Sequence, residues 1–131
     1  MSLEISTLPP PPQTSLKTIQ MAGLLVDVYG LSDLPPTATH ISCLWLHHPR
    51  TRSKEYMADI AARCIGAWNA SQGKLGGGRR GLVALAYDQR NHGGRVVDKM
   101  ANGAWREGNE MHAVDMFGVV QGMVGDQRGL L

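Results

Sequence analysis

Two short polar segments contain the side chains best suited to chemistry. One reads Asp-Gln-Arg-Asn-His-Gly-Gly at residues 88–94, and the other reads His-His-Pro-Arg at residues 47–50. Histidine and aspartate can act as general bases or bind a metal ion, and arginine can pair with a carboxylate to brace a turn. Each segment directly follows an apolar run, at residues 82–87 and 41–46, which predicts a strand.

The apolar run at residues 82–87 has no polar alternation. Such a run is typical of a strand that is buried on both faces, as in a parallel sheet. The polar, glycine-containing segment that follows would then form a turn at the carboxyl end of that strand. Ligands of open α/β sheets bind at this edge, so the turn is a candidate site.

A zinc site built from the residues around the first strand is not expected. His40 and Cys43 would point to opposite faces of a strand, whereas Cys43 and His47 would share a face. At about 3.3 Å per residue, these last two residues stand roughly 13 Å apart. Zinc ligands converge on one ion at about 2.0–2.3 Å each, and the addition of His48 does not change this conclusion. We therefore predict no metal site.

The glycine-rich segment at residues 73–81 is expected to be a flexible linker. A phosphate-binding loop needs Gly-Lys-Ser/Thr leading into a helix, whereas here Lys74 precedes the glycines and an apolar strand follows them. We therefore expect no cofactor.

The other elements follow from hydrophobic periodicity. Residues 17–21 and 24–29 predict a leading antiparallel hairpin. A helix is expected from the N-cap Ser53 to about Asn69. Its apolar stripe comprises Tyr56, Met57, Ile60, Ala61, Cys64, Ile65 and Trp68. The order strand, helix, strand that follows the hairpin predicts a right-handed parallel crossover.

A second helix is expected after an irregular segment at residues 96–108. Asn109 is a suitable N-cap with Glu110 behind it, and two glycines, Gly125 and Gly129, flank the predicted end. His112 and Asp115 are spaced to pair weakly on its surface. The apolar stripe comprises Ala113, Val114, Phe117, Val120 and Val124.

Length and composition set the class of protein. The 131 residues suffice for one domain, predicted at residues 17–131, after a disordered proline-rich tail at residues 1–16. A net charge of +2 gives no basis for nucleic-acid binding. No apolar run could span a membrane, and no secretory signal is present, so a cytoplasmic location is expected. Cys43 and Cys64 fit buried free thiols better than a disulfide.

The strand and turn at residues 82–93 resemble the strand-four segment of the α/β-hydrolase family. The usual family pattern is an apolar run followed by Asp-x-Arg-Gly-His-Gly. Here Asp88, Arg90, His92 and Gly93 match, and Asn91 replaces the usual glycine.

The resemblance extends over nearly the whole chain from about Lys17. The segments at residues 46–50, 88–93 and 101–109 look like those of a group of fungal hydrolases of this fold. It implies an incomplete α/β-hydrolase fold, with strands one to four and the first two helices. The sheet would be mostly parallel, with a leading antiparallel hairpin.

The segment after strand three supplies a backbone N–H to the oxyanion hole of this family, where it usually reads His-Gly-x. His48, Pro49 and Arg50 occupy that place here. His48 and Arg50 are thus the oxyanion-hole candidates. Arg50 is favoured as the donor, because proline has no N–H.

No catalytic triad residue is expected in this chain. The nucleophile motif Gly-x-Ser-x-Gly is absent, and the triad acid and histidine of the family follow the serine in sequence. Asp88, Arg90, His92 and Gly93 are therefore expected to be structural residues of the turn after strand four, with Asp88 and Arg90 able to pair.

Two functions are compatible with these features. In the first, the chain is the N-terminal part of a serine hydrolase, truncated before the nucleophile. Ester-like substrates would then bind only to the complete enzyme, and the chain alone would be inactive. In the second, it is a non-catalytic interaction module. Strand three would lie at an open sheet edge without strand five, so residues 41–46 could pair with a partner or with another copy. Either way, we expect marginal stability for the isolated chain.

Overall fold

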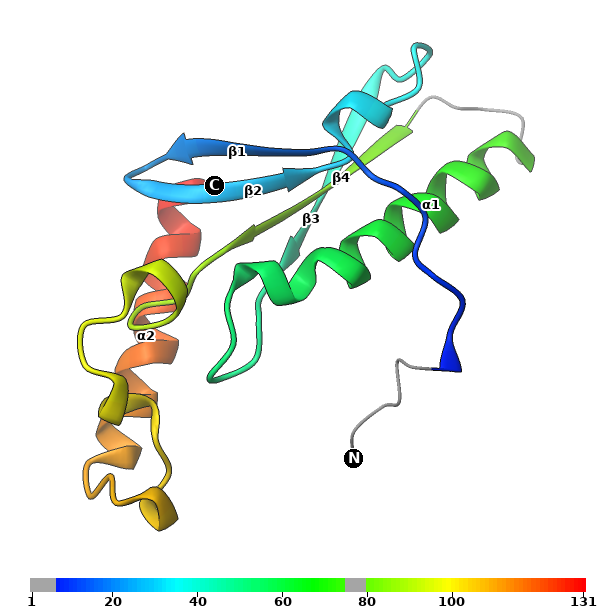
Figure 1. Cartoon of the computed structure of the whole chain (residues 1–131). Coiled ribbons are helices and arrows are strands. Elements are labelled where there is room, and N and C mark those ends of the chain that lie inside the picture. The colour runs from blue at the N-terminus through cyan, green and yellow to red at the C-terminus, as the bar shows by residue number, and fades with distance from the viewer. Residues whose placement is uncertain (1–6, 75–79) are drawn as a thin grey trace.

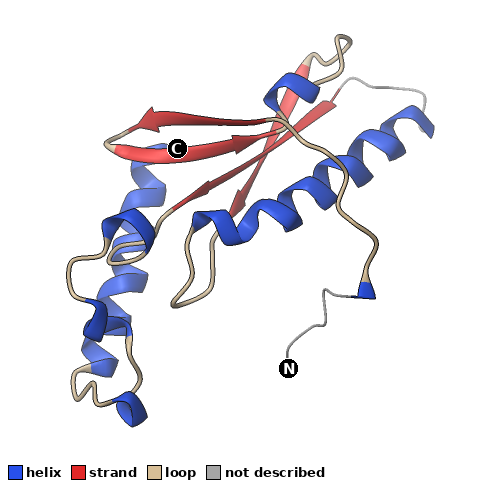
Figure 2. Ribbon diagram, viewed as in Figure 1, coloured by secondary structure: helices blue, strands red, loops and turns tan. Residues whose placement is uncertain are grey.

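The fold is α/β, with a mixed four-stranded sheet and two long helices (Figures 1 and 2). The structure is a computed structural model that describes residues 7–74 and 80–131. The main elements are β1 (Leu16–Met21), β2 (Leu24–Tyr29), β3 (His40–Leu46), α1 (Ala58–Lys74), β4 (Arg80–Tyr87) and α2 (His112–Leu130).

The strand order is β1-β2-β4-β3, which places β4 between β2 and β3. The pairs β1–β2 and β2–β4 are antiparallel, and only β3–β4 is parallel. The prediction of a mostly parallel sheet is therefore wrong. The hairpin contributes two of the four strands and joins β4 in the antiparallel sense, so a single crossover, β3-α1-β4, remains to form a parallel pair.

The prediction that residues 82–87 form a doubly buried strand is confirmed, because β4 is central and buried from Val83 to Tyr87. Successive side chains of a strand point to opposite faces. One face carries the cluster Leu24, Val26, Val28, Val83, Leu85 and Tyr87. The other face packs against α1 through the cluster Tyr29, Met57, Ala61, Ile65, Ala84 and Ala86.

Helix α1 differs from its prediction at both ends. Ser53 takes the N-cap position, without a side-chain capping bond, of a short 3₁₀ turn, Lys54–Met57, that precedes the α-helix. The helix extends to Lys74 instead of ending near Asn69. Part of the predicted glycine-rich linker is therefore helical, and residues 75–79 of that linker lie outside the described residues.

Helix α2 begins at His112, three residues later than predicted, and continues through Gly125 and Gly129 to Leu130. Near its C-terminal end, Leu130 packs against the sheet and the Tyr87 hydroxyl donates to the Met123 carbonyl. Its predicted apolar stripe is solvent-exposed, including Val114, Phe117, Val120 and Val124. No part of the described chain covers this side of the helix.

The described part of the proline-rich tail lies against α1 (Figure 1). The Arg63 guanidinium donates to the Pro9 carbonyl at 2.8 Å. Pro12 packs so closely on Gly66 that a Cβ there would lie 2.5 Å from the Pro12 ring. Disorder remains a prediction for residues 1–6, which lie outside the described residues.

Both cysteines are free, but Cys43 is exposed on β3 and so departs from the prediction of two buried thiols; Cys64 is half-buried. Across residues 7–74 and 80–131, no helix has the length and apolarity needed to cross a membrane.

Candidate functional site

The turns after β3 and β4 lie side by side, because the two strands are parallel and end at the same edge of the sheet. His48 joins them. Its Nε2 accepts the backbone N–H of Gln89 at 3.1 Å, and its carbonyl accepts the Gln89 side-chain amide.

The hydrogen bonds of His48 define its protonation state. Because Nε2 is an acceptor, the ring proton is on Nδ1, which donates to the Pro49 carbonyl at 2.9 Å. Burial lowers the pKa of His48, and the nearby His92 lowers it further. The ring is therefore neutral at pH 7, and both of its nitrogens are occupied in holding the two turns together.

Arg50, the other oxyanion-hole candidate, lies in a tight turn. The Arg52 N–H donates to the Pro49 carbonyl at 3.1 Å, and Thr51 has φ 69°, as at the third position of a type II turn. The Arg50 guanidinium donates to the Asn102 carbonyl at 2.7 Å. Among the described residues, the backbone N–H of Arg50 has no acceptor.

Asp88 connects the turn after β4 with the start of α1. Its carboxylate accepts the backbone N–H of Lys54 at 2.8 Å and that of Gly94 at 3.0 Å. Gly93 has φ 55°, and a Cβ at this position would lie 2.3 Å from the Asp88 carboxyl group. Glycine is therefore needed at residue 93 both for the backbone angle and for space.

The Asp88–Arg90 pair suggested by the sequence does not form. Arg90 instead lies over Gly122 of α2, with its guanidinium 3.7 Å from the Asp126 carboxylate. Arg95, which the sequence analysis did not single out, donates to the Asp88 carbonyl at 2.7 Å and to Asp126 at 2.8 Å. Arg95 thus takes the bracing role that was expected of Arg90.

Asn91 organises the loop that follows β4. Its φ of 61° lies in the left-handed region, which asparagine tolerates better than most residues and glycine tolerates best. Its Oδ1 accepts the N–H groups of Val97 and Asp98, and its Nδ2 donates to the Asp98 carbonyl and to Asn102 Oδ1. The sequence offered one sign of this backbone angle, because Asn91 stands where the pattern Asp-x-Arg-Gly-His-Gly has glycine.

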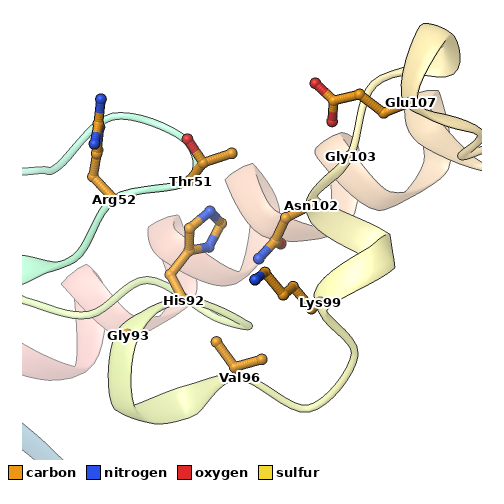
Figure 3. A pocket seen from close by; sticks show the side chains of 9 residues that line it. All are labelled: Thr51, Arg52, His92, Gly93, Val96, Lys99, Asn102, Gly103 and Glu107. Carbon is orange, nitrogen blue, oxygen red and sulfur yellow. The ribbon is translucent and has the colours of Figure 1, made fainter.

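His92 is buried beside His48, with the ring centroids 5.2 Å apart. Its Nδ1 lies 2.9 Å from the Arg90 carbonyl, so this nitrogen carries the proton. Its Nε2 is buried without a hydrogen-bond partner among the described residues. The ring forms part of the wall of a hollow of about 400 Å³ between the turn after β3 and the loop after β4 (Figure 3).

A buried ion pair that the sequence analysis missed joins β2 to the 3₁₀ turn before α1. Asp27 on β2 is 2% exposed and accepts from Lys54 Nζ at 2.8 Å and from the Thr18 hydroxyl at 2.7 Å. An aspartate within an apolar strand was the signal, but its partner could not be read from sequence spacing.

Within residues 7–74 and 80–131, no three side chains of His, Cys, Asp or Glu cluster so that they could hold a metal ion.

In the loop before α2, Asn109 donates to Asp115 at 3.0 Å, and His112 lies 2.9 Å from the Gly103 carbonyl. The predicted His112–Asp115 pair is therefore replaced by these contacts.

Comparison with solved structures found a partial similarity. No family model and no curated protein matches the sequence. The chain is similar to the crystal structure of TT1662 from Thermus thermophilus, with 18% sequence identity and a TM-score of 0.40. The match covers 85% of this chain and 41% of that chain, so this chain spans less than half the length of the neighbour.

Proposed function

We propose that this chain is part of a serine hydrolase of the α/β-hydrolase fold, which in its complete form hydrolyses an ester-like acyl compound. The observation that best supports the proposal is the pair of turns after β3 and β4, held together by His48 and Gln89. The turn after β4 also carries the family-like pattern at Asp88, Arg90 and His92.

In this proposal the turn after β3 contributes to the oxyanion hole. A serine attacks the substrate carbonyl, and backbone N–H groups stabilise the negative charge that develops on its oxygen. Pro49 has no N–H to give, whereas the N–H of Arg50 has no acceptor in the described chain. Arg50 is therefore the proposed donor, while His48 holds the turn in place without transferring a proton.

The nucleophile would come from outside these residues, because the sequence lacks Gly-x-Ser-x-Gly. Strand β3 lies at an edge of the sheet and has a free side where a further strand could pair. A strand in that position would end next to the turn after β3, so a serine that follows it would lie close to Arg50.

The proposal is tested by covalent labelling in source cells. A lysate is treated with a serine-directed fluorophosphonate, denatured and precipitated with an antibody against the Ser53–Trp68 peptide. We expect a labelled polypeptide in the precipitate. If only a native precipitate contains label, the serine belongs to a bound partner. If neither contains label, the chain is not part of a serine hydrolase. The purified 131-residue chain is the control and should not turn over p-nitrophenyl esters.

The exposed edge of β3 favours one alternative, a non-catalytic interaction module. Ile41 is 52% exposed and Cys43 is exposed, so this edge strand presents apolar surface beside unpaired backbone groups. A partner strand, from another protein or from a second copy, could add to the sheet there.

A charge on this edge tests the alternative. Cys43→Lys should abolish association in size-exclusion chromatography, because lysine on an edge strand opposes pairing. Gln20→Lys, at an exposed position on the opposite edge strand β1, is the matched control and should leave association unchanged. Equal association of both variants with the partner would rule out pairing through β3.

A further inference from the structure

The hollow beside His92 has features of a small-molecule site that the proposed function does not use. Its volume of about 400 Å³ falls in the range of ligand pockets, roughly 300–1,000 Å³. One wall comes from the turn after β3 and the other from the loop after β4 (Figure 3). The lining residues used in the argument are Thr51, Arg52, His92, Lys99, Asn102 and Glu107.

The charges on its wall favour an anionic group. Arg52 and Lys99 line the hollow, and neither forms an ion pair within the described residues. The Arg52 guanidinium lies 5.3 Å from the centre of the Tyr56 ring, which holds the cation near the rim without neutralising it. Glu107 is the one carboxylate on the wall, and its Oε2 already accepts the Ala104 N–H at 3.0 Å.

His92 adds a hydrogen-bond acceptor. Its Nδ1 carries the proton, so its buried, unpartnered Nε2 can only accept. In Figure 3 the ring extends from its backbone toward Thr51, whose side chain is exposed. Asn102 is already engaged, because both ends of its amide are bonded to Asn91.

We propose that this hollow binds a small molecule that carries both an anionic group and a hydroxyl. Arg52 and Lys99 bind the anionic group, and the ligand hydroxyl donates to His92 Nε2. The anionic group is a carboxylate or a phosphate, which share this recognition. The site requires no serine and no oxyanion hole, so it does not depend on the hydrolase proposal.

Binding is measured by NMR on the full 131-residue chain with ¹³C-labelled histidine. The probes are malate, succinate, glycerol 3-phosphate and glycerol, each titrated while the ring resonances of His92 are followed. Malate should bind about fivefold more tightly than succinate, which lacks the hydroxyl, because one hydrogen bond is worth about 1 kcal/mol. Glycerol should cause no shift, and comparison of malate with glycerol 3-phosphate assigns the anionic group. Equal affinity for malate and succinate, or no His92 shift with any probe, would overturn the proposal.

Variants at exposed positions complete the test and leave the buried His92 intact. Arg52→Gln and Lys99→Gln should each weaken binding of the preferred anion by about fivefold or more. Arg106→Gln removes an exposed cation of the same loop that does not line the hollow, and it should bind like the wild type. If Arg106→Gln weakens binding as much as Lys99→Gln does, the attraction is diffuse and there is no specific site.

Discussion

At the scale of single residues, Asn91 shows how one side chain can organise a loop from a left-handed backbone position. The position requires a left-handed backbone, which glycine adopts freely and asparagine adopts at small cost. Asparagine then adds what glycine cannot, four side-chain hydrogen bonds to Val97, Asp98 and Asn102.

Replacing Asn91 with glycine should therefore preserve the turn and loosen the loop. We expect Asn91→Gly to lower the free energy of unfolding by about 1–3 kcal/mol, because four hydrogen bonds are lost. Hydrogen exchange of the Val97 and Asp98 amides should become faster. Asn91→Asp keeps the acceptor for both amides and should give an intermediate result. Unchanged exchange in Asn91→Gly would show that the loop does not depend on this side chain.

His48 predicts a pH dependence of stability. Burial lowers its pKa in the folded state below the ordinary value of 6.5, and the pKa of His47 is lowered in the same way. The unfolded chain therefore binds more protons below pH 6.5. The stabilisation is complete above pH 6.5 and is lost as the pH falls toward the lowered folded pKa values.

Urea unfolding at pH 7.5 and 5.5 measures this effect. The wild type should be less stable at pH 5.5, and His48→Gln should show a smaller difference between the two pH values. His40→Gln, at an exposed position on β3, is the control and should keep the wild-type difference. If His48→Gln has the same pH difference as the wild type, His48 is not responsible for the effect.

At the scale of elements, Lys54 makes the polar contacts that tie the 3₁₀ turn before α1 to the sheet. The backbone of Lys54 donates to Asp88 on one side, and its ammonium group pairs with the buried Asp27 on the other. These contacts link the 3₁₀ turn before the helix to both β2 and the end of β4. The alanines of β4, Ala84 and Ala86, leave room for the helix to pack closely along the strand.

Loss of the Lys54 ammonium group should be costly. Lys54→Met leaves the Asp27 carboxylate with only the Thr18 hydroxyl, and we expect a loss of about 3 kcal/mol in the free energy of unfolding. Arg63→Met removes the more exposed pair with Asp59 and should cost at most about 1 kcal/mol. The double variant Asp27→Asn, Lys54→Met should recover part of the loss, because no buried charge remains. Equal stability of Lys54→Met and the wild type would contradict this account.

The elements also show where prediction from sequence succeeds and where it stops. The buried strand β4 follows from its unbroken apolar run. The stripe predicted for the first helix is confirmed only in part, because Met57, Ala61 and Ile65 are buried in the core. Tyr56 and Ile60, on the flank of this stripe, are exposed. The predicted start of α2 was wrong. Asn109 Oδ1 accepts the Met111 N–H, as an N-cap would, but this bond closes a turn and the α-helix begins only at His112. Periodicity shows that a stripe is apolar, but it does not show whether another element covers it.

At the scale of the whole molecule, strand order could not be obtained from periodicity. The order strand, helix, strand predicted a parallel crossover, and the structure confirms that β3 and β4 pair in parallel. The contacts of the site were harder to predict. Those of Arg95, Asn91 and Lys54 join segments whose separation in sequence carries no regular signal.

Within residues 7–74 and 80–131, apolar surface is uncovered at the free edge of β3 and along the exposed stripe of α2. Phe117, at the middle of the stripe, is 68% exposed. Large exposed apolar surfaces indicate contact with another element or protein. Both proposed functions use the edge of β3, and neither accounts for the stripe on α2 by itself.

The position of β4 also governs how the chain can fold during its synthesis. This strand is the last of the four to leave the ribosome, yet β2 and β3 touch in the sheet only through it. Before residue 80 emerges, the nascent chain holds a two-stranded hairpin, which is marginally stable on its own, and a helix without the alanine face on which it packs. Pairing of Val26 with Tyr87 then closes a long loop in one late step. Chains stalled before β4 would consequently be substrates for chaperones and proteases, whereas a few further residues complete the sheet.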